Sequence, residues 1–306
     1  MKKKTIITYL VFAFALAWII WGILALLGVD LSSTLASIVL PISMYMPAAA
    51  VLVTKLLNRG TRIMGASFKP KFRGHIRWYL LAWLLPIVLV FLGQFLSFCV
   101  FPGSFDPQMG ALRLSLASAH PGSVITDSAV YTSLFMNILL VITIGVISTM
   151  ILTFGEEVGW RGFLFPAVRS RTTEVKSHVI CGTIWGLWHA PVIVMGYNFG
   201  IGYWGFPWAG ILVMCVLSIS MGIFLSYLTR KSGSIWPAVL AHGALNTVAS
   251  ALSEVFLRED YSASANTTFV TNVIQYVIPC LFLGIPLLIV LARKNEGKDN
   301  SLAVTE

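Results

Sequence analysis

Charged side chains are scarce in this sequence. Asp, Glu, Lys and Arg together make up 11% of the 306 residues, whereas about 25% is usual in a soluble globular domain. Hydrophobic residues reach 57%, and the mean hydropathy is +0.85. They gather in blocks of about 20 residues, the length at which a helix crosses a hydrocarbon layer of about 30 Å. The composition therefore excludes a soluble domain and predicts an all-α fold, a polytopic transmembrane helix bundle.

The apolar blocks predict about eight spans. Each must be a helix, because lipid offers no hydrogen-bond partner to the backbone. The first block follows Lys2–Lys4, but it is too long for a signal peptide and lacks a clear cleavage site, so we expect it to be a retained span. The predicted spans are 5–28, 34–57, 77–101, 130–153, 177–196, 208–229, 235–257 and 270–292.

Basic residues are nearly missing from alternate loops. With the N-terminus inside, 19 of the 21 Lys and Arg residues fall in inner segments, and only Arg113 and Arg258 fall outside. This asymmetry is the positive-inside rule, so it predicts that both termini are cytoplasmic. The net charge of +9 therefore does not indicate a nucleic-acid partner. We expect a multi-pass plasma-membrane protein whose surroundings are membrane lipids.

Two segments between the spans are distinctive. The basic segment "ASFKPKFRGHIRW" (66–78) has aromatic residues among its cations, which is typical either of a segment on anionic head groups or of a solvated inner loop. The outer segment "GYNFGIGYWGFPW" (196–208) is rich in glycine and aromatic residues. It predicts either an interfacial belt or a cap over a cavity.

Cysteine is also rare, and its placement excludes several classes of site. The four cysteines are isolated in apolar spans with no CxxC pair, so they indicate small core residues and not a disulfide framework or a metal site. The sequence has no repeat at a fixed period, which argues against a small transporter that uses buried Glu and His as a proton relay.

The few ionisable residues inside the spans are concentrated in three of them. Such a residue costs about 2.5–3.5 kcal/mol near the centre of a membrane helix and usually faces the bundle interior or a wet cavity. Glu156 and Glu157 lie at the end of the fourth span, His189 lies in the fifth, and His242 lies with Asn246 in the seventh. Each residue alone could be an interfacial anchor or a hydrogen-bonding group between helices. Together on three neighbouring spans they predict one site.

Helical spacing separates the two glutamates. Glu157 and Arg161 are four residues apart and can form an ion pair on one helix face. Glu156 is rotated by about 100° from that face and has no local partner. The spacing therefore predicts that Glu157 is neutralised and that Glu156 remains available for chemistry.

The other two spans show the same spacing of four. His242 and Asn246 share a face, as do Trp185 and His189, and Pro191 predicts a kink just after His189. Glycines four residues apart accompany these groups and predict close helix contacts; they are Gly155 with Gly159 and Gly182 with Gly186. The remaining histidines, His75, His120 and His178, are expected to be solvated, and Glu254 is expected near the outer interface.

This set of side chains suits hydrolysis by an activated water. A desolvated glutamate has a raised pKa and can act as a general base, and an asparagine amide can donate to an oxyanion. No Ser or Cys has a convincing base beside it, which disfavours covalent catalysis. Glu156, His189 and His242 could bind zinc with one open position, but no HExxH pair supports this. The cofactor is therefore either zinc or absent.

The ordered motifs Glu156-Glu157-x-x-x-Arg161, Trp185-x-x-x-His189 and His242-x-x-x-Asn246 resemble those of the CPBP (Abi) family. That family contains CAAX prenyl endopeptidases, often labelled metalloproteases, and bacterial bacteriocin-immunity and bacteriocin-processing proteins. The resemblance covers roughly residues 135–252. One departure is Trp185, where the family commonly has Phe; because an aromatic is retained, this touches packing more than chemistry.

The resemblance implies an intramembrane endopeptidase that cleaves peptide or protein substrates. By the resemblance Glu156 is the general base, His189 and His242 line the water site, and His242 with Asn246 steadies the oxyanion. Glu157, Arg161 and Trp185 are supporting residues. The alternative is a non-catalytic immunity or partner-binding scaffold of the same fold.

The resemblance also divides the chain. It implies N-terminal helices with a basic loop (1–134), a catalytic core (135–252) and a last helix with a tail (253–306). One difficulty remains. With the spans as drawn, Glu156 lies at the inner end of its span, whereas His189 lies about 18 Å deep in the next, so the site assembles only if the fourth span ends later or a kink closes the gap.

Overall fold

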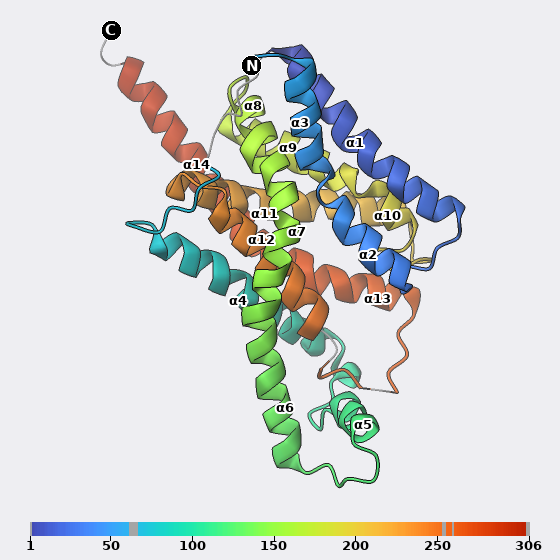
Figure 1. Ribbon diagram of the computed structural model, residues 1–306. Coiled ribbons are helices and arrows are strands. Elements are labelled where there is room, and N and C mark those ends of the chain that lie inside the picture. The colour runs from blue at the N-terminus through green and yellow to red at the C-terminus, as the bar shows by residue number, and fades with distance from the viewer. Residues whose placement is uncertain (1, 61–66, 253–254, 259, 304–306) are drawn as a thin grey trace.

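The computed structural model describes residues 2–60, 67–252, 255–258 and 260–303, and in these ranges the chain is almost entirely helical (Figure 1). The predicted all-α class is confirmed, because the described residues form no strand and show only two isolated bridges, Ser67 to Ser234 and Phe105 to Leu257. The helices are α1 (Lys3–Leu26), α2 (Thr34–Ser43), α3 (Met46–Leu57), α4 (Ile76–Val100), η1 (Pro102–Ser104), α5 (Gly110–Ala119), α6 (Asp127–Leu140), η2 (Val141–Gly145), α7 (Val146–Gly159), η3 (Trp160–Leu164), α8 (Phe165–Arg169), α9 (Glu174–Trp188), α10 (Ala190–Val194), α11 (Trp208–Ser232), α12 (Trp236–Leu252), α13 (Ala265–Asn272), η4 (Val273–Val277) and α14 (Ile278–Ala303).

The apolar blocks of the sequence all lie in helices, and the chain is a multi-pass membrane protein. Among the described residues five helices are long and apolar enough to cross a membrane, or six if α2 and α3, bent by 41°, form one span. Two further predicted spans are shorter: α9 with α10 is broken at His189, and α12 has 17 residues. The count of eight and the cytoplasmic termini therefore stay predictions. The predicted position of Glu254 lies outside the described residues.

The fourth span ends much later than residue 153, and that boundary was wrong. α6, η2, α7, η3 and α8 form one helical rod of 43 residues from Asp127 to Arg169 (Figure 1, green). η2 and η3 are single π-helical turns, which are frequent within helices at functional sites. Arg161, expected in an inner loop, is 4% exposed inside this rod. The helix continues because Glu157 neutralises Arg161 within the bundle, so neither charge forces the chain into water.

This extension resolves the difference in depth between the two halves of the site. Glu156 lies 13 residues before Arg169, and His189 lies 15 residues after Glu174. At 1.5 Å per residue both are about 20–22 Å from the end of their helix. The helix of His189 ends at Trp188, and Pro191 occupies the first turn of α10, as the kink prediction required.

Close helix contacts bring the polar residues together. A Cβ at Gly182 would lie 2.4 Å from the Cα of Ile219, and one at Gly186 would lie 2.4 Å from the Cα of Cys215. α9 therefore packs backbone to backbone against α11, which only glycine permits. A Cβ at Gly155 would lie 2.7 Å from the Cα of Tyr45, between α2 and α3, and one at Gly159 would lie 2.4 Å from the Cβ of Pro47 in α3. The predicted role of these glycines is confirmed.

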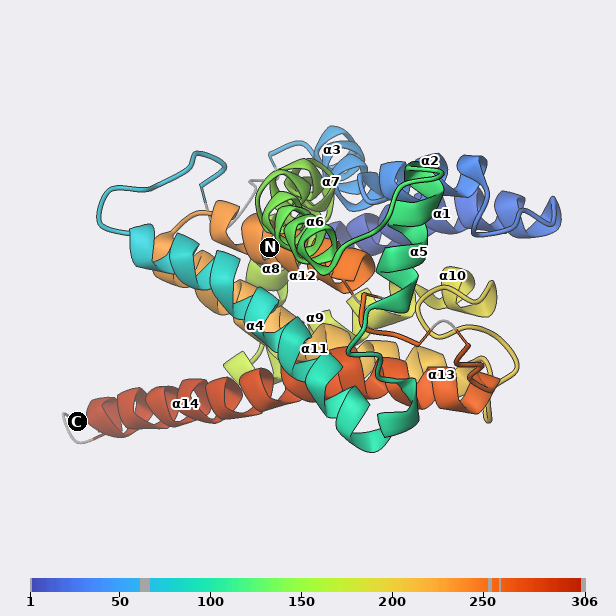
Figure 2. The ribbon, with the colours of Figure 1, turned by 90° about the horizontal axis from the view of Figure 1, so that it is seen from below.

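Seen from below, the helices are grouped around α7 (Figure 2). Figure 2 shows α1, α2 and α3 on one side of α7, with α4, α11 and α14 on the other. The largest cluster of buried apolar side chains joins α1 to α9 and α11 and includes Trp188. The Trp188 indole donates a hydrogen bond to the carbonyl of Ala13 at 3.0 Å. The first helix, α1, therefore packs against α9, which carries part of the predicted site.

Candidate active site

Glu156 is a buried carboxylate held by neutral donors. Its side chain, on α7, is 2% exposed. Its Oε2 accepts hydrogen bonds from the indole Nε1 of Trp160 at 3.0 Å and of Trp185 at 2.7 Å. Within the described residues no cation pairs with it, and its Oε1 accepts no protein hydrogen bond. The carboxylate is thus fixed in place by two donors that do not neutralise it.

Glu157, the next residue, has the opposite surroundings. It is 0% exposed, and its Oε1 accepts from Nη1 of Arg161 at 3.0 Å and from Nδ1 of His242 at 2.9 Å. The predicted pair with Arg161 is therefore present. The Arg161 guanidinium also stacks over the Trp185 ring, 4.3 Å from its centroid, a favourable cation–π geometry. Glu157 is therefore a buried carboxylate whose contacts hold Arg161 and His242 in place.

The hydrogen bonds of the two histidines define which ring nitrogen remains available in each ring. Nδ1 of His189 donates to the carbonyl of Trp185 at 2.9 Å, so in the neutral ring Nε2 carries the lone pair. Nδ1 of His242 is bound to Glu157, which leaves its Nε2 as the free position. The His242 ring stands edge-on to Trp185, with centroids 5.3 Å apart. Both histidines therefore present Nε2 as the nitrogen available to a ligand.

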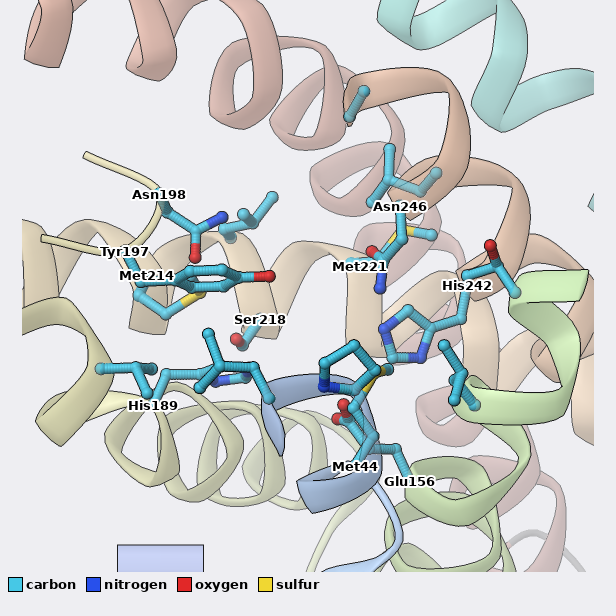
Figure 3. Close-up of a pocket in the computed structure, with 18 of the residues that line it drawn as sticks. Met44, Glu156, His189, Tyr197, Asn198, Met214, Ser218, Met221, His242 and Asn246 are labelled. Atoms are coloured by element: carbon cyan, nitrogen blue, oxygen red, sulfur yellow. The ribbon is translucent and has the colours of Figure 1, made fainter. Parts of the chain in front are cut away.

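All four predicted catalytic residues line one cavity of about 670 Å³. Glu156, His189, His242 and Asn246 reach it from α7, the break between α9 and α10, and α12 (Figure 3). Figure 3 shows His189 on one side of the cavity, His242 and Asn246 on the other, and Glu156 below them. Trp185 also lines the wall. The rest of the lining is mainly apolar and includes Met44, Met214, Met221, Leu40, Leu152 and Leu217.

Sequence reasoning missed one hydrogen-bond donor to Glu156, which does not itself line the cavity, and several polar side chains that do. Trp160, the second indole donor to Glu156, is four residues after it in the sequence, so helical spacing could have found it. Tyr197 and Asn198, in the loop after α10, and Ser218 on α11 also line the cavity. They lie in a loop and on a span without ionisable groups, and no spacing in the sequence connects them to the motifs.

The residues do not fit a zinc site. In the part of the chain that the structure describes, no group of three His, Cys, Asp or Glu side chains is arranged to hold a metal ion. The proposed ligand set of Glu156, His189 and His242 is therefore directed around a cavity and does not converge on one metal position.

A second cluster of charges, the Glu174 cluster, lies outside the cavity. The carboxylate of Glu174 accepts from Nε of Arg169 at 2.8 Å, from Nε2 of His178 at 3.1 Å and from Arg230. Burial alone raises the pKa of Glu174, but the hydrogen bonds from His178 and Arg169 and the charge of Arg230 outweigh it and lower the pKa to about 2. His178 is only 3% exposed, so the prediction that it is solvated was wrong. The partner of His178 is Glu174, which is buried one turn earlier on α9. The position of His178 at the end of a predicted span did not suggest such a partner.

Comparison with known proteins agrees with this geometry. Residues 128–248 match the family model described as type II CAAX prenyl endopeptidase Rce1-like. These residues contain the motifs that resemble the CPBP family, and the match supports a relation to CAAX-protease-like membrane proteins. It is similar to CAAX prenyl protease 2 of Methanococcus maripaludis, with 30% identity over 93 residues, which cover 30% of this chain and 34% of that relative. The matched residues 128–248 contain all seven motif residues, and the match spans about a third of the relative's length.

Proposed function

We propose that this protein is a CPBP-family intramembrane endopeptidase. It hydrolyses peptide bonds of membrane-associated peptides or proteins with a water activated by Glu156 and His189. The observation that supports this most is the buried Glu156, held by two indoles without a cation and facing a cavity shared with His189, His242 and Asn246. A desolvated carboxylate with no neutralising partner is suited to take a proton.

The first step forms the bond between water and the scissile carbonyl carbon. The water donates to the free Oε1 of Glu156 and to Nε2 of His189, and Glu156 takes its proton as the oxygen attacks. The carbonyl oxygen becomes negative and accepts hydrogen bonds from the Asn246 amide and from Nε2–H of protonated His242, whose Nδ1–H stays on Glu157. Glu157 therefore supports the charge on His242 that the oxyanion requires.

The second step breaks the carbon–nitrogen bond. The tetrahedral carbon expels the amine, and Glu156 returns its proton to the leaving nitrogen. The products are a new carboxylate and a new amine, with one water consumed. Catalysis in this scheme uses only residues of this chain, as a glutamate-dependent site.

The test is hydrolysis by the purified protein in lipid vesicles. Peptides that carry an isoprenyl cysteine near the C-terminus are compared with unmodified peptides, because the relative is named as a prenyl protease. In ¹⁸O-labelled water one heavy oxygen should enter the new carboxylate, and Glu156→Gln should abolish it. Wild-type protein that cleaves neither peptide while protecting cells from a bacteriocin would instead support the non-catalytic scaffold.

We further propose that the protein lies in the plasma membrane with both termini cytoplasmic. Support comes from the 19 of 21 basic residues in the predicted inner segments and from Figure 1, where the start of α1 and the end of α14 lie at the same end of the bundle. A C-terminal reporter that is active only outside the cytoplasm would contradict this orientation.

A further inference from the structure

The loop between α10 and α11 contains five residues with positive φ. Four are glycines, at positions 196, 200, 202 and 205, and the fifth is Asn198 with φ of 67°. Left-handed backbone costs a residue with a side chain more than it costs glycine, although Asn tolerates it best. A strained residue at a site is a reason to look for a function of its side chain. The loop uses glycine at every other such position, so the carboxamide of Asn198 requires an explanation.

The shape of this loop does not depend on the Asn198 side chain. The backbone carbonyl of Asn198 accepts from Nδ2 of Asn272 at 2.8 Å, and Phe199, 1% exposed, packs edge-on against Phe269. The backbone N–H of Trp204 donates to Oδ1 of Asn266 at 2.7 Å. Backbone and apolar contacts thus fix the loop on α13. The carboxamide of Asn198 is left exposed and has no hydrogen bond within the described chain.

Tyr197 presents a second unpaired polar group beside it. Its side chain is 43% exposed, it lines the catalytic cavity, and its hydroxyl has no hydrogen bond within the residues that the structure describes. Figure 3 shows Tyr197 reaching across the cavity from the side of His189 toward the side of Asn246, with the Asn198 carboxamide above it. Desolvation raises the pKa of Tyr197 above its ordinary value, so the phenol is a protonated donor at neutral pH. The loop therefore directs one donor and one carboxamide into the cavity.

We propose that Tyr197 and Asn198 bind the main chain of the substrate peptide next to the scissile bond. A carboxamide has one donor group and one acceptor, as a peptide group does, so Asn198 can pair with a peptide N–H and C=O while Tyr197 donates to a further carbonyl. The Asn198 carboxamide and the Tyr197 hydroxyl are both neutral, so they recognise the main chain of the peptide and not a particular side chain. The segment 196–208 is then a substrate-binding cap and not merely an interfacial belt. This inference rests on the proposed endopeptidase function.

Binding of main chain that does not react affects substrate and transition state equally. Such uniform binding appears in KM and leaves kcat unchanged. Removal of one neutral hydrogen bond is worth about a 2- to 12-fold change in an equilibrium constant. We therefore expect Tyr197→Phe and Asn198→Gly each to raise KM about 3- to 10-fold at nearly unchanged kcat.

Asn198→Gly makes the test sharp, because glycine relieves the backbone at φ of 67° and should leave the melting temperature equal or higher. A residue needed only for loop shape would lose nothing on this change. The matched controls are Tyr203→Phe, a buried tyrosine of the same loop, and Ile201→Gly, which adds the same flexibility; neither residue lines the cavity. Both controls should keep the wild-type KM.

The same variants are placed in a Glu156→Gln background, where peptide binding is measured by fluorescence without cleavage. Weaker binding for Tyr197→Phe and Asn198→Gly, and not for the two controls, supports the proposal. An unchanged KM and binding constant, a loss confined to kcat, or an equal loss in the controls overturns it. Full peptidase activity of Glu156→Gln overturns the proposed function instead, so the two failures are distinguishable.

Discussion

The candidate catalytic cavity and the Glu174 cluster both bury a glutamate to 2% exposure, yet the surroundings of the two glutamates differ. Glu174 accepts from two arginines and a histidine. Glu156 accepts from two indoles and faces a cavity of about 670 Å³. The first carboxylate is neutralised and closed off, and the second is fixed, uncompensated and accessible. Burial of a charge therefore does not mark a reactive group; the charge of its partners and access to the group do.

Exchange of carboxylate for carboxamide at the two positions should give opposite phenotypes. Glu156→Gln keeps an oxygen for the Trp160 and Trp185 indoles but cannot take a proton. We expect peptide hydrolysis to fall by about 10³-fold, within the range of general-base contributions, with an unchanged melting temperature. Glu174→Gln should keep kcat near wild type. Progress curves and thermal melts of the purified variants test both, and an active Glu156→Gln protein would refute the comparison.

Removal of the cation beside Glu157 should damage stability most. Arg161→Met leaves Glu157 buried at 0% exposure with only His242 as a partner, and loss of one member of a buried pair costs about 3–5 kcal/mol. The control is Arg113→Met, because Arg113 pairs with Asp127 at the surface, where such pairs contribute about 0–1 kcal/mol. Unfolding in mixed detergent micelles measures both. Equal losses would contradict the assignment of Glu157 and Arg161 as a buried structural pair.

The Glu174 cluster should make stability depend on acid. The folded pKa of Glu174 is about 2, lowered from 4.5, so the folded state prefers the ionised form. This stabilisation is fully present above about pH 4.5 and is lost as the pH falls toward 2. Glu174→Gln should be destabilised by about 1.5–3 kcal/mol at neutral pH, the value of hydrogen bonds to a charged group. It should also lose less stability than wild type between pH 4.5 and 2, and parallel pH profiles in unfolding experiments would count against the cluster.

A methyl group added between α9 and α11 should lower both stability and kcat, whereas one added on the open face of α1 should lower neither. Gly186→Ala places a Cβ 2.4 Å from the Cα of Cys215 and pushes α9 away from α11, at a cost of about 1–3 kcal/mol. Since His189 follows within one turn, kcat should fall as well. Gly22→Ala in α1 meets nothing within 4 Å and should instead stabilise its helix by about 0.5–1 kcal/mol. If kcat stays at the wild-type value in Gly186→Ala, the placement of His189 does not depend on this contact.

The sequence contained most of the candidate site because spacing within a helix is local information. Glu156, Glu157 and Arg161 lie within two turns, and His242 precedes Asn246 by one turn, so the faces that these residues share follow from the period of the helix. Their meeting in one cavity was a hypothesis that rested on the glycines, and the backbone contacts of Gly182 and Gly186 explain how it is achieved. The catalytic roles themselves stay predictions.

The sequence did not reveal which of the local pairs are buried, nor the contacts between distant segments. Arg161 was counted in the inner segment 161–176, although its predicted pair with Glu157 is buried within the helical rod. His178 was expected in solvent because it lies at the end of a predicted span, but its partner Glu174, one turn earlier, is buried and also pairs with Arg230 of α11. Tyr197 and Asn198 lie in a segment for which the sequence left a cap and a belt open, and the proposal of a cap rests on the packing of this loop on α13.

The helical rod from Asp127 to Arg169 has 43 residues, a length of about 65 Å. A hydrocarbon layer is about 30 Å thick, and tilts beyond about 40° are rare, so about 25 Å or more of this rod must extend past the layer. Glu156 is much nearer to the Arg169 end. The part of the rod near Asp127 can therefore be covered by a thicker bilayer or exposed by a thinner one while Glu156 keeps its depth. Turnover should then vary little with the acyl chain length of the host lipid.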